Sequence, residues 1–105
     1  MEQPNLSYIE NMFGGDKAFE QKLIDIIKEE FPEEKRIYFE NLSAKNYELV
    51  AQNVHKLKHK ISILGLEKSY DIATRFETNL LDGETHLYEE FETILNTISA
   101  FLKQL

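Results

Sequence analysis

The residues best suited to chemistry lie together in the six positions from His55 to Lys60, which hold two histidines and three lysines. The chain as a whole is acidic, with 19 Asp and Glu residues against 12 Lys and Arg, yet no acidic residue occurs between Leu49 and Leu66. A local excess of positive charge of this kind attracts anions, including a phosphoryl group. The stretch therefore indicates a site where histidine and lysine side chains handle an anion.

A helical period brings four polar residues of this region onto one stripe of the helix surface. These residues, related by steps of three, four and seven positions, are His55, Lys58, His59 and Ser62. The apolar stripe beside them, which we expect to be buried, consists of Val54, Leu57, Ile61 and Leu64. We therefore expect His55 to face solvent in the middle of a helix, at the edge of the core.

This arrangement suits the carriage of a phosphoryl group. Neutral imidazole is a good nucleophile near pH 7, which makes His55 the candidate acceptor. The ammonium of Lys58, one turn later, can pair with the new anionic oxygens after transfer. Ser62 either donates a hydrogen bond to a phosphoryl oxygen or bonds back to its own helix. We expect Lys56 and Lys60 to be solvated charges that flank the site.

Four long segments with a 3.6-residue apolar period, and a short one before them, must position these residues. The large apolar residues of the four segments are, in order, Phe19, Leu23, Ile26, Ile27, Phe31, Tyr38 and Leu42; Tyr47, Val50, Val54, Leu57, Ile61 and Leu64; Leu66, Tyr70, Ala73, Phe76 and Leu80; and Leu87, Phe91, Ile94, Ile98, Phe101 and Leu105. Each pattern predicts an amphipathic helix with one buried face.

Residues that begin and end helices lie between these segments. Asp16 and Asn46 are expected N-caps, and Gly65 and Asp82-Gly83 are expected to end helices. Gly14-Gly15 should end a short leading helix over about residues 5 to 13.

Pro32 lies inside the first long pattern, where it either kinks that helix or begins a new one. The short links between segments favour antiparallel neighbours. We therefore predict an all-α fold, an antiparallel up-down four-helix bundle with a short extra N-terminal helix across one end. One domain fills residues 1–105.

The motif His55-x-Leu57-Lys58, followed by Leu64-Gly65, resembles the signature of histidine phosphotransfer (HPt) domains. In that family the motif reads His-x-Leu-Lys, then a small residue, then Leu or Phe with Gly ten positions after the histidine. The leader Leu6 to Phe13 before Gly-Gly-Asp, and the Phe-Pro pair in the preceding helix, also match the family's layout. The resemblance covers essentially the whole chain.

The resemblance implies that His55 accepts and donates the phosphoryl group, that Lys58 steadies it, and that Gly65 ends the helix. His59, Ser62 and Gly65 would contact the partner. The partners implied are receiver domains of response regulators and a hybrid sensor histidine kinase. Because the receiver supplies the aspartyl phosphate and Mg²⁺, the chain needs no cofactor of its own and is a carrier rather than an enzyme.

One position departs from the family pattern, since His59 stands where glycine, serine or alanine is usual, and Lys60 also replaces a commonly small residue. An imidazole at this position could crowd the receiver, select an unusual receiver, or mark a module that docks a signalling protein without carrying phosphate. The docking module is therefore an alternative function.

A metal site is a further alternative, because His55 and His59 have the i, i+4 spacing with which two imidazoles share Zn²⁺. A third ligand would have to come from another helix, such as a glutamate or His86. Three nearby lysines oppose a cation, so we predict no metal.

The bulk composition narrows the possible functions further. The net charge of −7 argues against binding to nucleic acid or to anionic lipid. Charged residues interrupt every apolar stretch before the roughly 18 residues that a membrane span requires. The chain has no cysteine and no N-terminal signal sequence, so we expect it in the reducing cytoplasm. A monomer is the default expectation for its oligomeric state.

Overall fold

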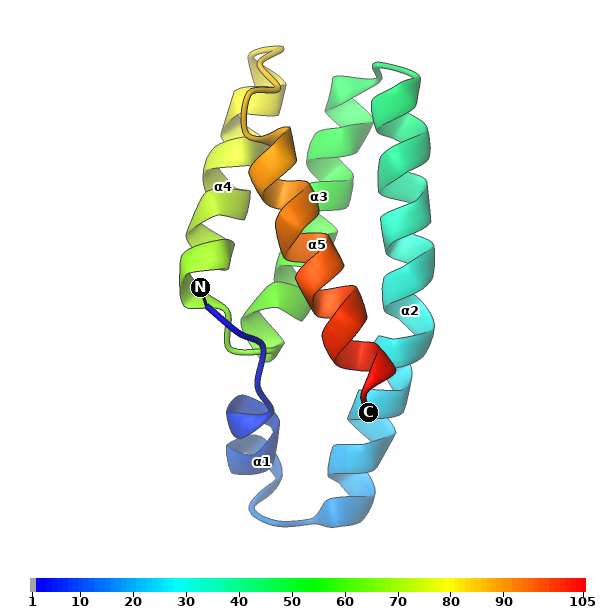
Figure 1. Ribbon diagram of the computed structural model, residues 1–105, viewed down its shortest axis with the longest axis vertical. Coiled ribbons are helices and arrows are strands. Elements are labelled where there is room, and N and C mark those ends of the chain that lie inside the picture. The colour runs from blue at the N-terminus through cyan, green and yellow to red at the C-terminus, as the bar shows by residue number, and fades with distance from the viewer. Residues whose placement is uncertain (1) are drawn as a thin grey trace.

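The computed structural model describes residues 2–105, and in this part of the chain the regular secondary structure is entirely helical (Figure 1). The five helices are α1 (Ser7–Phe13), α2 (Lys17–Ser43), α3 (Tyr47–Ile63), α4 (Glu67–Leu81) and α5 (Tyr88–Lys103). The predicted all-α class is confirmed, and each apolar pattern corresponds to one helix. No helix within residues 2–105 is both long enough and apolar enough to cross a bilayer.

The predicted N-caps are confirmed. The Asp16 carboxylate accepts hydrogen bonds from the backbone N–H groups of Ala18 and Phe19, at 3.2 and 3.3 Å, at the start of α2. The side chain of Asn46 accepts one from the backbone of Leu49, at 3.4 Å, at the start of α3. Both contacts satisfy N–H groups that a helix leaves without partners in its first turn.

Helix α2 continues through Pro32, so a new helix does not begin there. Proline has no N–H, and α2 therefore lacks the hydrogen bond that residue 32 would donate to the carbonyl of Lys28. Buried side chains on both sides of the proline, Phe31 before it and Tyr38 after it, hold the helix against the core.

The core joins all four long helices. Tyr38 of α2, Phe76 of α4 and Phe91 of α5 form an aromatic cluster, in which the Phe91 ring centroid lies 5.3 Å from each of the other two. The buried stripe predicted for α3 is confirmed, since Val54, Leu57, Ile61 and Leu64 are almost completely shielded from solvent. The apolar face of α3 therefore fixes which of its residues turn outward.

Four residues that the apolar patterns placed on buried faces are exposed: Phe19, Ile26, Tyr70 and Leu105. The first two lie in the N-terminal turns of α2, which extend past the end of α5 and have α1 beside them (Figure 1). Leu105 lies two residues beyond the end of α5. Ile26 lies between the buried Ile24 and Ile27, and Tyr70 lies against the Lys58 ammonium, so the apolar period alone does not define how wide each buried face is.

The helices contact one another in chain order, with α3 against α2 and α4, and α5 against α4 and α2, while α1 packs on α2. The α2–α3 and α4–α5 connections lie at one end of the four long helices, and the α3–α4 turn lies toward the other (Figure 1).

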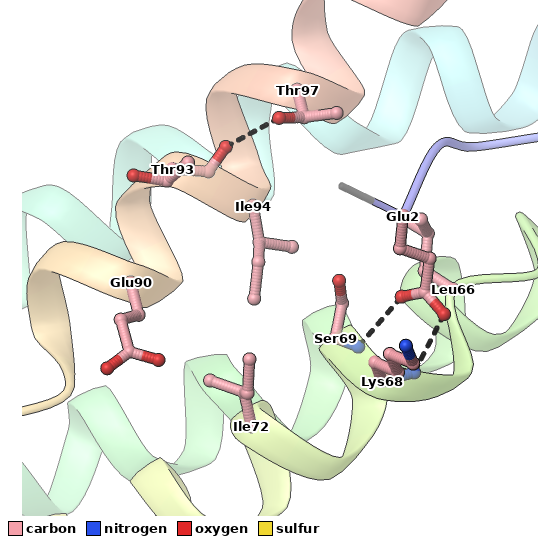
Figure 2. Close-up of a pocket in the computed structure, with 9 residues that line it drawn as sticks. All are labelled: Glu2, Leu66, Lys68, Ser69, Ile72, Glu90, Thr93, Ile94 and Thr97. Carbon is pink, nitrogen blue, oxygen red and sulfur yellow. Dashed lines mark hydrogen bonds between the residues drawn. The ribbon is translucent and has the colours of Figure 1, made fainter.

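The N-terminal segment fixes the α3–α4 turn. Leu66, the N-cap of α4, makes no side-chain cap; instead the Glu2 carboxylate accepts hydrogen bonds of 2.9 Å from the backbones of Lys68 and Ser69. Figure 2 shows these two bonds at the rim of a pocket between α4 and α5, with Ile72 and Ile94 on opposite sides. A residue far away in sequence thus caps α4.

Gly65 ends α3 as predicted and has φ of +77°, a conformation that favours glycine. A Cβ atom at this position would lie 2.7 Å from the Asn5 side chain. The backbone N–H of Asn5 also donates a 2.9 Å hydrogen bond to the Leu64 carbonyl. The glycine therefore allows both the turn and the close approach of the N-terminal segment.

Candidate functional site

His55 lies in the middle of α3, and its side chain is 61% exposed. The neighbouring Val54 and Leu57 are fully buried and anchor this part of the helix. The position agrees with the prediction of a solvent-facing histidine at the edge of the core.

The His55 ring is bound by a carboxylate that the sequence analysis did not identify. Nδ1 of His55 lies 3.2 and 3.1 Å from the two carboxylate oxygens of Glu77 on α4. Nζ of Lys58 lies 3.3 Å from Oε1 of the same carboxylate. We refer to His55, Lys58 and Glu77 as the histidine site; Glu77, 22% exposed, connects the other two.

The contact with Glu77 favours one tautomer of the neutral His55 ring. A carboxylate oxygen accepts a hydrogen bond, so neutral His55 makes this contact by carrying its proton on Nδ1. The lone pair is then on Nε2, which becomes the nucleophilic atom. The carboxylate also stabilises the positive charge that the ring acquires when Nε2 forms a bond, as carboxylates do for histidines in other sites.

Lys58 lies outside the apolar stripe, and the sequence therefore predicted an exposed side chain. In the structure this side chain is only 11% exposed. Its Nζ lies 5.0 Å from the centroid of the Tyr70 ring, in addition to its ion pair with Glu77. The reason is that the polar stripe of α3 borders α4, whose side chains cover Lys58. The ammonium is therefore held in place before any ligand arrives.

His59 and Ser62, which the sequence predicts to contact a partner, are both exposed. The His59 ring centroid lies 5.7 Å from that of His55, with the two planes nearly perpendicular. Ser62 and Gly65 line a surface pocket of about 530 Å³ together with Tyr8 of α1 and Tyr70 of α4. Among residues 2–105, no hydrogen bond from Ser62 back to its own helix is found.

The cationic character predicted for α3 is partly offset by carboxylates of the neighbouring helices. Glu77 pairs with Lys58 from α4, while Glu30 and Glu34 of α2 lie 2.8 and 3.3 Å from Nζ of Lys60. Lys60 is only 12% exposed, so the expectation of a solvated flanking charge is wrong for this residue. The stretch from Leu49 to Leu66 has no acidic residue of its own, but carboxylates of neighbouring helices lie against it. The local sequence therefore did not predict the net charge around His55.

The alternative of a metal site requires a third ligand beside His55 and His59. His86 lies at the α4–α5 connection, where its Nε2 is 3.3 Å from Nδ2 of Asn79. Within residues 2–105 no group of three or more His, Asp or Glu side chains is arranged to hold a metal ion. His55 itself is engaged with Glu77 through Nδ1.

Glu77 carries only a weak signal in the sequence. It lies 22 positions after His55, and Gly65 falls near the middle of that interval. Two helices that run in opposite directions from a tight turn bring such positions together. The contact between His55 and Glu77 can be predicted only when the pairing of α3 with α4 is known. The 3.6-residue period does not show which helices pair.

Comparison of the chain with protein-family models, with curated proteins and with solved structures gave no match. The geometry of the histidine site and the motif that surrounds it are therefore the features that bear on function.

Proposed function

We propose that this protein is a histidine phosphotransfer carrier that relays a phosphoryl group between aspartates of response-regulator receiver domains. In this proposal the four long helices form an antiparallel up-down bundle that presents His55 to each receiver in turn. The protein acts as a cytoplasmic monomer in a phosphorelay that starts from a hybrid sensor histidine kinase. It has no enzymatic activity of its own.

The observation that carries the proposal is the exposed imidazole of His55, whose Nδ1 is held by Glu77 while Lys58 lies on the same carboxylate. In the proposed step Nε2 attacks the phosphorus of the receiver's aspartyl phosphate. The N–P bond forms as the P–O bond to the aspartate breaks, and the aspartate leaves as a carboxylate. Nδ1 keeps its proton throughout, so the phosphorylated ring is positively charged and Glu77 balances that charge.

The residues have separate tasks in this scheme. Glu77 orients the ring, and Lys58 supplies a positive charge beside the incoming phosphoryl oxygens. The receiver contributes the Mg²⁺ and most of the transition-state stabilisation, so the carrier holds no cofactor. The reverse reaction passes the group to a second receiver.

The proposed docking face surrounds His55 on α3. It includes the exposed residues His59 and Ser62, and it extends to Tyr8 of α1, an exposed aromatic residue that lines the same pocket as Ser62. On the other side of His55 a pocket of about 310 Å³ reaches Leu81 at the end of α4. Exposed aromatic side chains such as Tyr8 are of a type enriched in protein interfaces.

The second candidate, a docking module that transfers nothing, is favoured by one observation. The His59 ring stands edge-to-face with His55 at 5.7 Å, so a receiver that approaches His55 must also accommodate this second imidazole. In this alternative the receiver binds the same face without reaching Nε2.

A transfer assay with receivers phosphorylated by acetyl phosphate, in the presence of Mg²⁺, separates the two functions. If the protein is a carrier, the wild type acquires an acid-labile phosphoryl group. The His55→Gln variant then acquires none, yet it binds the receiver with unchanged affinity. Binding of a phosphorylated receiver by the wild type without any transfer would instead establish the docking module.

A further inference from the structure

A second cationic site lies between α2 and α5, on helices that do not contribute to the histidine site. Three lysines line a surface pocket of about 390 Å³ at this place: Lys28 and Lys35 of α2, and Lys103 of α5. The C-terminal part of α5 lies beside α2 in Figure 1. Three of the twelve basic residues of an acidic chain therefore converge on one hollow.

These lysines have no carboxylate partner within residues 2–105, in contrast to Lys58 and Lys60. Nζ of Lys35 is held by neutral acceptors, 3.2 Å from Oδ1 of Asn96 and 2.9 Å from Oγ of Ser99. Burial, and then the charge of Lys103, lower the pKa of Lys35 from its ordinary value. The ammonium groups repel each other, and an anion would relieve that repulsion.

The rest of the pocket is apolar. Phe31 and Leu102 are buried side chains of the core that form its inner wall, and the Pro32 ring lies beside them. An anion that fills this pocket therefore needs, in addition to its charged group, an apolar part that covers this wall. Simple inorganic anions would leave the apolar wall uncovered.

We propose that this pocket, which we call the lysine pocket, binds a small organic anion that has a carboxylate or phosphate headgroup on an apolar body. Lys35, already held by Asn96 and Ser99, binds the headgroup, and Lys28 and Lys103 approach it from the rim. The apolar body lies against Phe31 and Leu102. The proposal is independent of phosphotransfer, because the pocket shares no residue with the histidine site.

The test is a titration of the ¹⁵N-labelled protein with phenyl phosphate, followed by ¹H–¹⁵N NMR. We expect saturable shifts at the amides of Phe31, Lys35 and Ser99, with a dissociation constant of about 1 mM or tighter, the range for a ligand of this size. Benzoate serves as the carboxylate probe and distinguishes the two headgroups. Inorganic phosphate, which lacks the apolar body, should bind about tenfold more weakly, since the wall stays uncovered.

Variants locate the binding. Lys35→Gln should weaken it by about tenfold, the usual cost of losing one hydrogen bond to a charged group. Lys103→Gln, on the exposed rim, provides a second variant with little risk to the fold. The matched control is Lys22→Gln, an exposed lysine of α2 outside the pocket, which should bind like the wild type.

Four results would overturn the proposal. The first two are shifts that do not saturate and shifts that centre on His55 and Lys58. The others are equal binding of uncharged benzyl alcohol, and equal affinities of Lys22→Gln and Lys35→Gln.

Discussion

His55 on α3 and Glu77 on α4 face each other across the helix pair, with Nδ1 of the histidine 3.1 Å from Oε2 of the glutamate. The same carboxylate is 3.3 Å from Nζ of Lys58. One acidic residue thus sets the tautomer of the candidate acceptor and the position of the candidate phosphoryl-binding cation. Because the carboxylate comes from another helix, the pairing of α3 with α4 is itself part of the site.

Replacing Glu77 should affect transfer through the ring of His55. In Glu77→Gln the amide oxygen still accepts from Nδ1, but the charge that balances the phosphorylated ring is lost. We expect transfer to slow by about tenfold in Glu77→Gln and about a hundredfold in Glu77→Ala, the range seen when a partner that orients a histidine is removed.

Two measurements separate this positioning role from general damage to the fold. Nitrogen NMR of the imidazole should report the Nδ1–H tautomer in the wild type and a mixture of tautomers in Glu77→Ala. Asp71→Asn, which alters an exposed carboxylate of the same helix that lines neither of the pockets beside His55 and Ser62, should transfer at the wild-type rate. An unchanged tautomer and rate in Glu77→Ala would remove Glu77 from the mechanism.

The cap that Glu2 provides should make stability depend on pH. Burial acts to raise the pKa of Glu2, but the hydrogen bonds from the backbones of Lys68 and Ser69 outweigh it, and the pKa lies below its ordinary 4.5. A carboxyl group with a lowered pKa stabilises the folded state above its unfolded pKa. This contribution is lost as the pH falls through the folded pKa.

We therefore expect Glu2→Gln to reduce the free energy of unfolding at pH 7 by about 0.5 kcal/mol, a cap contribution reduced by solvent screening. At pH 3 the difference from the wild type should be smaller, because the wild-type carboxylate is then becoming protonated. Urea unfolding at the two pH values measures this, and Glu10→Gln on the surface of α1 is the control. A difference that grows at low pH would contradict the cap.

The ion pairs of Lys60 should contribute to stability rather than to phosphotransfer. Lys60→Met leaves Glu34, only 8% exposed, without its cation, and we expect a loss of about 3 kcal/mol in the free energy of unfolding. The double variant Lys60→Met with Glu34→Leu should recover most of this loss, since no unpaired charge remains.

Lys56→Met, which removes an exposed charge of the same helix, provides the control and should leave stability nearly unchanged. Urea unfolding gives the free energies, and the transfer assay gives the rate per folded molecule. A Lys60→Met protein that is as stable as the wild type but slow in transfer would move Lys60 into the site.

The hydroxyl of Tyr38 is buried in the aromatic cluster and has no hydrogen-bond partner within residues 2–105. A buried polar group without a partner destabilises the folded state. Tyr38→Phe should therefore increase the free energy of unfolding by about 1 kcal/mol. Tyr47→Phe, at a partly buried position outside the cluster, is the comparison; a loss of stability in Tyr38→Phe alone would show that the hydroxyl is satisfied.

The sequence predicted the features that depend on local patterns. Periodicity identified the buried stripe of α3, and short polar side chains identified the caps at Asp16 and Asn46. These features are determined within a turn or two of helix. His55 was found in the same way, because its exposure follows from the apolar residues on either side.

The features that depend on packing were missed. The ion pairs of Lys58 and Lys60, and the cap by Glu2, join residues that are at least 19 positions apart in the chain. A helical period shows which face of a helix is buried but not which side chains of its neighbours lie against it. For this reason the charge around His55 could not be derived from the composition of α3.

The most direct test of the account is to determine which atom carries the phosphoryl group after transfer. The protein is incubated with a phosphorylated receiver and Mg²⁺, the modified residue is located by mass spectrometry, and ³¹P and ¹⁵N NMR identify the nitrogen. The account predicts a single acid-labile adduct on Nε2 of His55 that is absent from His55→Gln. An adduct on His59 or His86, or on Nδ1 of His55, would contradict it.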